Sequence, residues 1–377
     1  MIQKWKKNLG LLAVAGASVL ISVLFVFLLV TSVGNPGTSA QVDTPDIGIM
    51  DKFDMFMTNT ISDSLDGVLS IEKVYWLNDD VLVAPEPDQS RFGEAAEPAE
   101  VAALLEQGAD LIHDDNLYFD PETTQLAPNT NIMYYLDETI LTITWKEAHN
   151  NTMYTYSEVF IAHPSQFRRF LAGGEYGSEK QFVTTEMAAS VNAVVASSGD
   201  FYRFRNYGTI VYDGKVQRIR SENVDTCFID AEGDLIFNYR GEITDIEEAQ
   251  QFVDDNNIRF SVAFGPILVD DGERCEPREY YLGEIKDPFP RAALCQMGKL
   301  HYLLIAANAE GPYGYTPDIY GFATNVAATG CEKAYTLDGG QTAVIAMNDQ
   351  LINRVLFGFQ RKISDIIYFA TAVPDGG

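Results

Sequence analysis

Basic residues are scarce in this chain. Lysine and arginine together number 26 among 377 residues, against 54 aspartates and glutamates, which gives a formal net charge of -28. Proteins that bind nucleic acid need a basic surface to meet the phosphate backbone, so this composition excludes nucleic acid as a partner. The same charge repels anionic small molecules. A phosphate-binding site would therefore need a local cluster of hydrogen-bond donors that outweighs the negative electrostatic field of the whole protein.

Cysteine and histidine are also sparse, at four residues each. They are Cys227, Cys275, Cys295, Cys331, His113, His149, His163 and His301. The cysteines form no C-x-x-C pair and the histidines are scattered, so a zinc site is not expected. The acidic residues lack the repeated oxygen-ligand spacing of a calcium loop. We therefore expect no metal and no other cofactor.

Three disulfide pairings are possible, and the sequence does not choose among them.

One long apolar run is present, over residues 9–33, and it contains no charged residue. Lys4, Lys6 and Lys7 precede it. The run exceeds the roughly 7–15 residues of a signal-peptide core and reaches the roughly 20 needed to span a bilayer. This pattern predicts an uncleaved, single-pass membrane anchor with a cytoplasmic N-terminus and the remaining chain outside the cell. The alternative is a cleaved signal peptide, with residues 38–40 as the cleavage site.

Changes in composition divide the chain into three parts. Residues 1–40 hold the lysines, the anchor and a short tether rich in Pro, Gly and Ser. Residues 41–137 are acidic and interrupted by prolines, which predicts a partly helical spacer or cap. Residues 138–377 are predicted to form the main folded domain. No internal repeat is visible.

Within the main domain, short strands alternate with single helices. Strands are predicted over 140–145, 154–162, 260–269, 301–307 and 365–372, with hairpins at 209–219 and 227–239. Helices are predicted over 186–196, 247–256 and 317–329. Hairpins mixed with single helices favour an α+β fold, in which helices pack on a largely antiparallel or mixed sheet.

Residues 330–342 contain the most informative local pattern, Gly-Cys-Glu-Lys-Ala-Tyr-Thr-Leu-Asp-Gly-Gly-Gln-Thr. A single acid, Asp338, stands beside Gly339 and Gly340 at the end of an apolar run. Glycine lets backbone amides approach a ligand closely, so those N–H groups and the Thr342 hydroxyl could contact the polar atoms of a substrate. The alternative is a tight hairpin turn, for which Asp-Gly is a common sequence.

Four other blocks accompany this motif: 189–193 (Ala-Ser-Val-Asn-Ala), 198–202 (Ser-Gly-Asp-Phe-Tyr), 263–268 (Ala-Phe-Gly-Pro-Ile-Leu) and 290–293 (Pro-Arg-Ala-Ala). In this order and spacing, residues 154–373 resemble the phosphodiester glycosidase family. An animal member of that family removes N-acetylglucosamine from a sugar phosphodiester. The family block at 198–202 is usually Asn-Gly-Gly followed by two aromatic residues, so Asp200 departs from the common form.

The resemblance implies a reaction at a sugar C1–O bond, which passes through an oxocarbenium-like state. A carboxylate stabilises that state by charge or by direct attack, and Asp338 is the candidate. Arg291 is the candidate phosphate ligand, because a guanidinium meets two phosphate oxygens and keeps its charge. Asp200 is a candidate second acid, base or hydroxyl ligand. The alternatives are a surface salt bridge for Arg291 and a turn at a helix end for Asp200.

Further substrate-binding candidates surround these three residues. Phe201 or Tyr202 could stack on the sugar, while Gly265 lies beside the site by resemblance. Glu310 and Thr316 belong to the loop that matches the family's glycine-containing loop, which here has Asn308 and Glu310 but no arginine. Alternative interpretations are a core position for Phe201, a strand-ending turn at Gly265 and a helix N-cap for Thr316.

We therefore expect a membrane-anchored, extracytoplasmic hydrolase that cleaves a sugar-1-phosphodiester at its glycosidic bond. Its location suggests phosphodiester-linked glycans of an envelope or exopolysaccharide as substrates. Two alternatives stay open. One is a non-catalytic module that binds an envelope phosphoglycan, and the other is an envelope scaffold that depends on residues 46–137.

Overall fold

A computed structural model describes residues 74–77, 80–83, 86–108, 132–276, 286–309 and 315–373. The predicted anchor at 9–33 and the candidate Glu310 lie outside these residues. The chain divides into two compact units, 1–61 and 62–377, and all described residues belong to the second. Among the helices of the described part, none has the length and apolar character needed to cross a bilayer.

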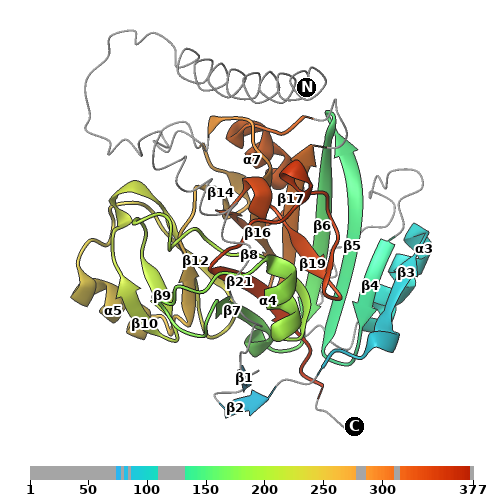
Figure 1. Cartoon of the computed structure of the whole chain (residues 1–377), viewed down its shortest axis with the longest axis horizontal. Helices are drawn as coiled ribbons and strands as arrows, with labels where there is room; N and C mark the ends of the chain where they lie inside the picture. The colour runs from blue at the N-terminus through green and yellow to red at the C-terminus, as the bar shows by residue number, and fades with distance from the viewer. Residues whose placement is uncertain are drawn as a thin grey trace, which may run out of the picture. The chain divides into compact units, whose positions relative to one another are not determined.

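A nine-stranded antiparallel sheet is the largest layer (Figure 1), with the strand order β15-β14-β18-β16-β17-β6-β5-β4-β3. Its strands are β3 (Phe92–Ala95), β4 (Ile132–Leu136), β5 (Ile140–His149), β6 (Thr152–Ile161), β14 (Ile267–Asp270), β15 (Glu273–Arg274), β16 (Arg291–Gly298), β17 (His301–Ala309) and β18 (Lys333–Leu337). β3 and β4 lie within the predicted spacer at 41–137, yet they pair directly into this sheet. That part of the chain is therefore continuous with the main sheet.

A five-stranded sheet, in the order β20-β19-β8-β21-β7, packs against one face of the larger sheet. It consists of β7 (Phe167–Leu171), β8 (Ala193–Ser198), β19 (Ile345–Met347), β20 (Gln350–Leu351) and β21 (Asp365–Ala370). Val195 and Phe369 from this sheet share a core with Leu294 and Leu304 from the larger one, and all four are completely buried. Burying each such side chain contributes about 1.5–3 kcal/mol, so the two sheets hold each other as a sandwich.

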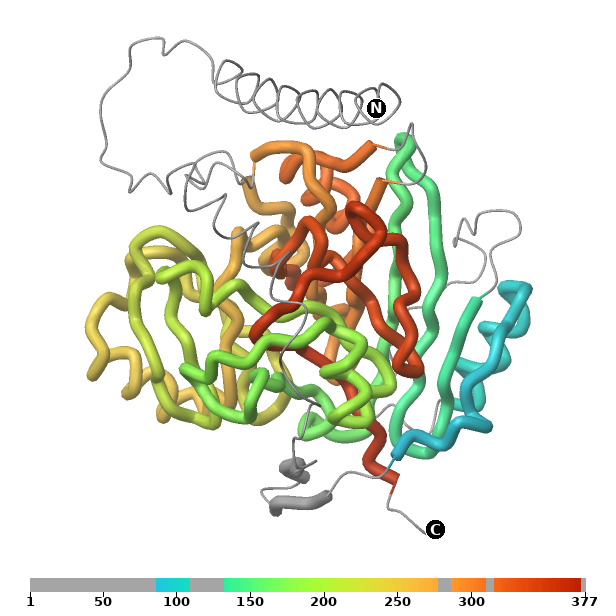
Figure 2. The backbone as a smooth tube through the Cα atoms, in the orientation of Figure 1, coloured from blue at the N-terminus to red at the C-terminus, as the bar shows by residue number. Residues whose placement is uncertain are grey.

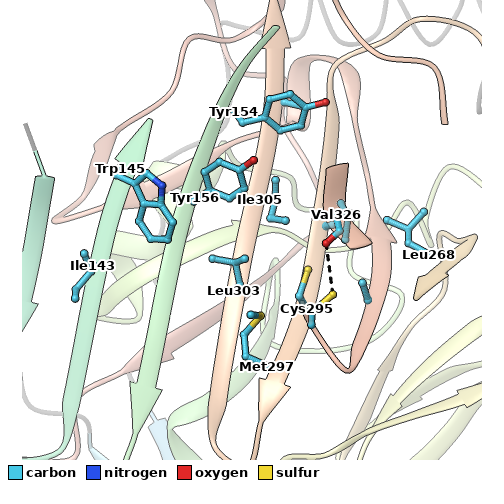
Figure 3. Packing of buried hydrophobic residues seen from close by; sticks show 14 of the residues in the cluster. Ile143, Trp145, Tyr154, Tyr156, Leu268, Cys295, Met297, Leu303, Ile305 and Val326 are labelled. Atoms are coloured by element: carbon cyan, nitrogen blue, oxygen red, sulfur yellow. Dashed lines mark hydrogen bonds between the residues drawn. The ribbon is translucent and has the colours of Figure 1, made fainter. Parts of the chain in front are cut away.

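Helices cover the outer faces of this sandwich. α3 (Pro98–Gly108) and α7 (Ile319–Ala327) pack on the nine-stranded sheet, in the cluster drawn in Figure 3. There the Trp145 and Tyr156 rings stack with centroids 5.3 Å apart. α4 (Thr184–Ser190) covers the five-stranded sheet.

Cys295 and Cys331 lie in the same cluster as α7, and the Cys331 thiol donates to the Val326 carbonyl at 3.7 Å (Figure 3). All four cysteines of the sequence are within the described residues, and each is a free thiol.

A second five-stranded sheet, β10-β9-β13-β11-β12, stands to the left in Figure 1 with α5 (Ile246–Asp255) against it. Its strands are β9 (Ile210–Tyr212), β10 (Lys215–Arg218), β11 (Thr226–Ile229), β12 (Leu235–Asn238) and β13 (Phe260–Val262). Both predicted hairpins are present here. Asp213 and Gly214 have φ values of 52° and 67°, the left-handed conformation that a two-residue hairpin turn requires. A short separate pair joins β1 (Val74–Leu77) to β2 (Asp80–Val83).

The predicted α+β class with a largely antiparallel sheet is confirmed for the described residues, in which every pairing between named strands is antiparallel. The helix predicted over 186–196 is wrong in its second half, which forms β8. Asn192, with φ 50°, ends the helix, and Val194 and Val195 are completely buried inside the sandwich. β-branched side chains suit such a strand better than a helix.

The strand predicted over 260–269 is also divided. It forms β13 and β14, which belong to different sheets, with the cis Gly265–Pro266 peptide between them. The chain thus leaves one sheet and enters the next at Gly265.

Candidate functional site

Three distant chain segments meet where β8, β16 and β18 approach one another. The Asp338 N–H donates to the Gly199 carbonyl at 3.1 Å, and the Gly340 N–H donates to the Pro290 carbonyl at 2.8 Å. The Ser198 hydroxyl adds a bond of 3.0 Å to the Asp338 carbonyl. Figure 2 shows the red C-terminal segment running beside the green segment that contains β8, in agreement with the β8–β21 pairing. The fold therefore gathers three of the sequence blocks at one place.

Asp338 follows the last residue of β18 and is only 5% exposed. Its Oδ2 atom lies 2.6 Å from Nη2 of Arg361, and its Oδ1 accepts the N–H of Gly339 at 2.9 Å. An ion pair this short and this protected from water is a charge-assisted hydrogen bond of the stronger kind. The carboxylate predicted from the sequence thus has a cationic partner, and that partner is a residue the sequence did not indicate.

Arg361 is held by an aromatic ring as well as by Asp338. Its guanidinium carbon lies 4.8 Å from the centroid of Phe201, whose ring stacks on Phe204 with centroids 4.7 Å apart. A guanidinium over a ring face gains cation–π attraction, which is larger when the pair is partly desolvated. Phe201 was predicted to stack on a sugar, but in this structure it supports the arginine. Nε of Arg361 makes no hydrogen bond to any described residue.

Arg291 begins β16 and is 4% exposed, so the surface salt bridge considered for it does not apply. β16 pairs with β18 with Ala292 opposite Leu337, and one further step along this register places Arg291 opposite Asp338. Its Nη2 atom donates to the carbonyl of Asp287. The predicted cation and the predicted carboxylate therefore stand at the same end of two paired strands.

The loop after Asp338 is not the tight hairpin that the sequence left open. It enters a short 3-10 helix, η6 (Gly340–Thr342), and the next strand, β19, belongs to the other sheet. The Gly340 N–H is bonded to Pro290, and the Thr342 hydroxyl donates to the Gly339 carbonyl at 2.7 Å. The donors that we expected to face a ligand instead fix the shape of this loop.

Gly339 fits where no other residue can. A Cβ atom at this position would come within 2.6 Å of the Pro290 carbonyl oxygen, which is backbone and cannot move aside easily. The glycine therefore allows the loop that carries Asp338 to lie directly against the start of β16.

Asp200 and Tyr202 turn away from Asp338 into a buried cluster. Asp200 Oδ2 accepts the N–H of Ala263 at 2.8 Å and lies 3.1 Å from Nη2 of Arg169. Its Oδ1 accepts the N–H of Tyr202 at 2.7 Å, and Tyr202 itself is only 2% exposed. Both carboxylate oxygens are therefore used inside the protein, and the Tyr202 ring cannot form the floor of an open sugar site.

The same arginine binds a second buried carboxylate, Asp365, at 2.9 Å. Two acids thus share one cation in a site without solvent. Burial raises the pKa of Asp365 to about 8, and the charge of Asp200 acts in the same direction, while Arg169 opposes it. We infer that Asp365 holds a proton at neutral pH.

Three further candidate residues were predicted from the sequence: Gly265, Thr316 and Glu310. Gly265 precedes Pro266, whose carbonyl accepts the N–H of Thr336 on β18 at 3.1 Å, so Gly265 borders the site. Thr316 does not cap α7 as considered above, because the N-cap is Asp318, which accepts the N–H of Gly321. Glu310 lies outside the described residues.

An amide pair supports the site from the C-terminal end of β17, where Ala307 pairs with Arg291. Asn308, 3% exposed, accepts a bond of 2.8 Å from Asn353, whose other bonds reach the backbone of residues 343–345. This pair connects the nine-stranded sheet to the segment that leads to Arg361. Neither Asn353 nor Arg361 belongs to a recognisable sequence motif, and only their long-range contacts reveal them.

The described residues contain no group of three or more His, Cys, Asp or Glu side chains arranged to hold a metal ion. The centre around Asp338 contains this carboxylate, the Arg361 guanidinium and backbone, and Arg291 begins the strand that pairs with β18. Such an arrangement can bind an anion with the arginines while the carboxylate meets a developing positive charge.

Residues 191–370 match the family model described as phosphodiester glycosidase, which confirms the resemblance over that segment. No curated protein matches the chain.

Solved structures with similarity to the chain include three of low sequence identity. The zebrafish N-acetylglucosamine-1-phosphodiester alpha-N-acetylglucosaminidase catalytic domain, auto-inhibited by its pro-peptide, is 15% identical with a TM-score of 0.49, covering 62% of this chain and 83% of that one. A hypothetical protein from Synechocystis is 13% identical with a TM-score of 0.44, covering 64% of each chain. A putative exported protein from Burkholderia pseudomallei is 13% identical with a TM-score of 0.40, covering 58% of this chain and 74% of that one.

Proposed function

Because residues 191–370 match the phosphodiester glycosidase family model, we propose that the protein hydrolyses a sugar-1-phosphodiester at the bond between C1 and the phosphate oxygen. The observation that supports this best is the short ion pair between Asp338 and Arg361, with the start of β16 at Arg291 beside it. The proposal assigns the carboxylate to the sugar carbon and the cations to the phosphate.

In the proposed reaction, the C1–O bond breaks and positive charge develops at C1, where the Asp338 carboxylate stabilises it or attacks it. Arg361 and Arg291 hold the phosphate oxygens and stabilise the negative charge that remains on the leaving group. Water supplies a hydroxyl group to C1 and one proton to the phosphate. The products are a free reducing sugar and a phosphomonoester.

A phosphate monoester is a far weaker base than a sugar alkoxide, so it leaves without the second carboxylic acid that ordinary glycosidases use. This matches a site in which the other nearby acid, Asp200, is committed to Arg169. We assign Asp200 the role of holding the 199–202 loop in place, and the catalytic role considered for it is not part of the proposal.

For the setting of the enzyme, we propose an extracytoplasmic location with the 9–33 segment as a membrane anchor, and phosphodiester-linked glycans of the envelope or exopolysaccharide as substrates. The uncharged run and the preceding lysines support this. N-acetylglucosamine is the first sugar to test, since the zebrafish protein named above acts on it.

The test uses the methyl diester of N-acetylglucosamine-1-phosphate and measures reducing sugar. Asp338→Asn keeps the shape of the side chain but removes its charge, so turnover should fall about 100-fold or more. Arg361→Ala and Arg291→Ala should raise KM strongly, because each removes a phosphate ligand. Arg354→Ala is the matched control, since this arginine is exposed and lies in the segment that leads to Arg361.

A folded Asp338→Asn protein with wild-type turnover would refute the assignment of Asp338. Binding of the diester without any release of sugar by the wild type would instead favour the non-catalytic phosphoglycan-binding module.

A further inference from the structure

We propose that Phe289, Phe357 and Phe359 form an aromatic platform, which binds the sugar rings of a glycan attached to the phosphate of the substrate. The proposal rests on the function proposed above and extends it, because it assigns a binding subsite to the leaving-group side. It predicts that the natural substrate carries a saccharide, and not a small alcohol, beyond the scissile phosphodiester.

These three rings are unusually exposed to solvent. Phe289 is 39% exposed, Phe357 71% and Phe359 55%, and they are the exposed phenylalanines among the described residues. Large aromatic side chains usually bury most of their surface, so a group of exposed rings marks a binding surface more often than a scattered single one does.

All three rings belong to segments that touch the turn immediately after Asp338. Phe289 precedes Pro290, whose carbonyl accepts the N–H of Gly340 at 2.8 Å. Phe357 lies in the short 3-10 helix η7 (Leu356–Gly358), which packs against η6. Phe359 is two residues before Arg361, the partner of Asp338. The three segments that carry these rings therefore adjoin the loop that follows Asp338.

The backbone holds one of these rings in a conformation that its residue type disfavours. Phe357 has φ 62°, in the left-handed region that is uncommon for bulky side chains. A phenylalanine that is both left-handed and largely exposed contributes little to the core, which fits a role in binding better than one in packing.

A saccharide is the occupant that the neighbouring chemistry favours. Gln341 lies in η6, which packs against η7, and its buried Nε2 makes no hydrogen bond to any described residue. Pyranose rings offer a C–H face that stacks on a flat aromatic ring and hydroxyl groups that accept from an amide. The acidic charge of the chain opposes an anionic membrane surface, and glycine and glutamine interrupt the aromatic surface at 358 and 360.

The experiment compares two diesters with the same scissile bond in the full-length protein. Both contain N-acetylglucosamine-1-phosphate, one with a methyl group and one with an N-acetylglucosamine trisaccharide on the phosphate. Phe357→Ala and Phe359→Ala should each lower kcat/KM for the trisaccharide diester about 2- to 10-fold, as expected for one lost ring contact. Hydrolysis of the methyl diester should not change.

Two conservative variants separate stacking from simple apolar contact. Phe357→Tyr keeps the flat ring and should keep the preference for the trisaccharide, whereas Phe357→Leu should lose it. Ile246→Ala on α5, 52% exposed, is the control for removing an exposed apolar side chain elsewhere. Equal effects on both diesters, or full rescue by leucine, would overturn the proposal.

A binding measurement keeps the outcome independent of turnover. If the wild type hydrolyses neither diester, the proposed function fails, and saturation-transfer NMR on the Asp338→Asn protein then tests the platform alone. Transfer to the trisaccharide C–H protons that disappears in the combined Phe357→Ala and Phe359→Ala variant would support the platform. Absence of transfer to the trisaccharide in the protein with all three rings would refute it.

Discussion

Two aspartates on neighbouring loop segments have different surroundings in this protein. Asp338 meets one arginine at the edge of the sandwich, while Asp200 is enclosed with Arg169 and Asp365. Both follow an apolar strand, so local sequence makes them look alike as candidate carboxylates. Their partners lie 23 and 31 residues away in the chain, which is why the sequence could not tell one from the other.

Asp365 gives a prediction about pH. Its pKa is raised from 3.8 to about 8 in the folded protein, so between these values the folded state holds a proton that the unfolded state releases. The stability from this group is complete below about pH 4 and is lost as the pH rises through about 8. Asp365→Asn imitates the protonated side chain and should flatten the fall of Tm between about pH 5 and about pH 9.

Thermal unfolding of both proteins across this range measures the effect. Parallel pH dependences for wild type and Asp365→Asn would show that Asp365 is ionised throughout. Gly199→Ala would not serve as a substitute, since a Cβ there would overlap the Asp365 carboxylate and disturb the cluster at every pH.

At the scale of elements, the segment between β20 and β21 contains the residues that the sequence did not indicate. It holds Asn353, Phe357 and Arg361 without regular strands or long helices, so no periodicity draws attention to it. Its shape depends on Asn353, which is 4% exposed and accepts the N–H of Ile345 at 2.7 Å. The long, regular elements, such as β5 and α5, were predictable because their patterns repeat over many residues.

Asn353→Ala should therefore weaken both the fold and the site. It removes the acceptor of the buried Ile345 N–H and the donor to Asn308 Oδ1, at a cost of about 1–3 kcal/mol in the free energy of unfolding. Turnover should also fall, because the segment that positions Arg361 loses its attachment. Denaturant unfolding and the reducing-sugar assay measure these two effects.

Gln350→Ala provides the matched control, since this amide is exposed on the short edge strand β20. It should change the free energy of unfolding by no more than about 0.5 kcal/mol. Equal losses in the two variants would contradict the role given to Asn353.

At the scale of the whole molecule, a chain of formal charge -28 is proposed to act on an anion. The arginines at the site are local and partly buried, whereas the acidic residues repel the substrate over longer distances. Salt screens the long-range repulsion more than the short contacts, so it should help this enzyme to meet its substrate.

Raising sodium chloride from about 10 mM to about 100 mM shortens the Debye length from about 30 Å to about 10 Å. We expect kcat/KM for the methyl diester to rise over this range. The same diester with a choline group in place of methyl carries no net charge and should respond weakly. A fall in kcat/KM for the anionic diester would mean that attraction by the arginines already dominates at long range.

The sequence by itself determined the α+β class, most of the strands and helices, the family resemblance and the position of Asp338, because these depend on local patterns and on residues close together in the chain. Its net charge also argues against nucleic acid as a partner, and this prediction needs no fold. Tertiary structure alone decided that Arg361 pairs with Asp338, that Asp200 faces Arg169, and that η7 packs against η6 after Asp338. These contacts join residues brought together by strand pairing and sheet packing, and no local pattern encodes them.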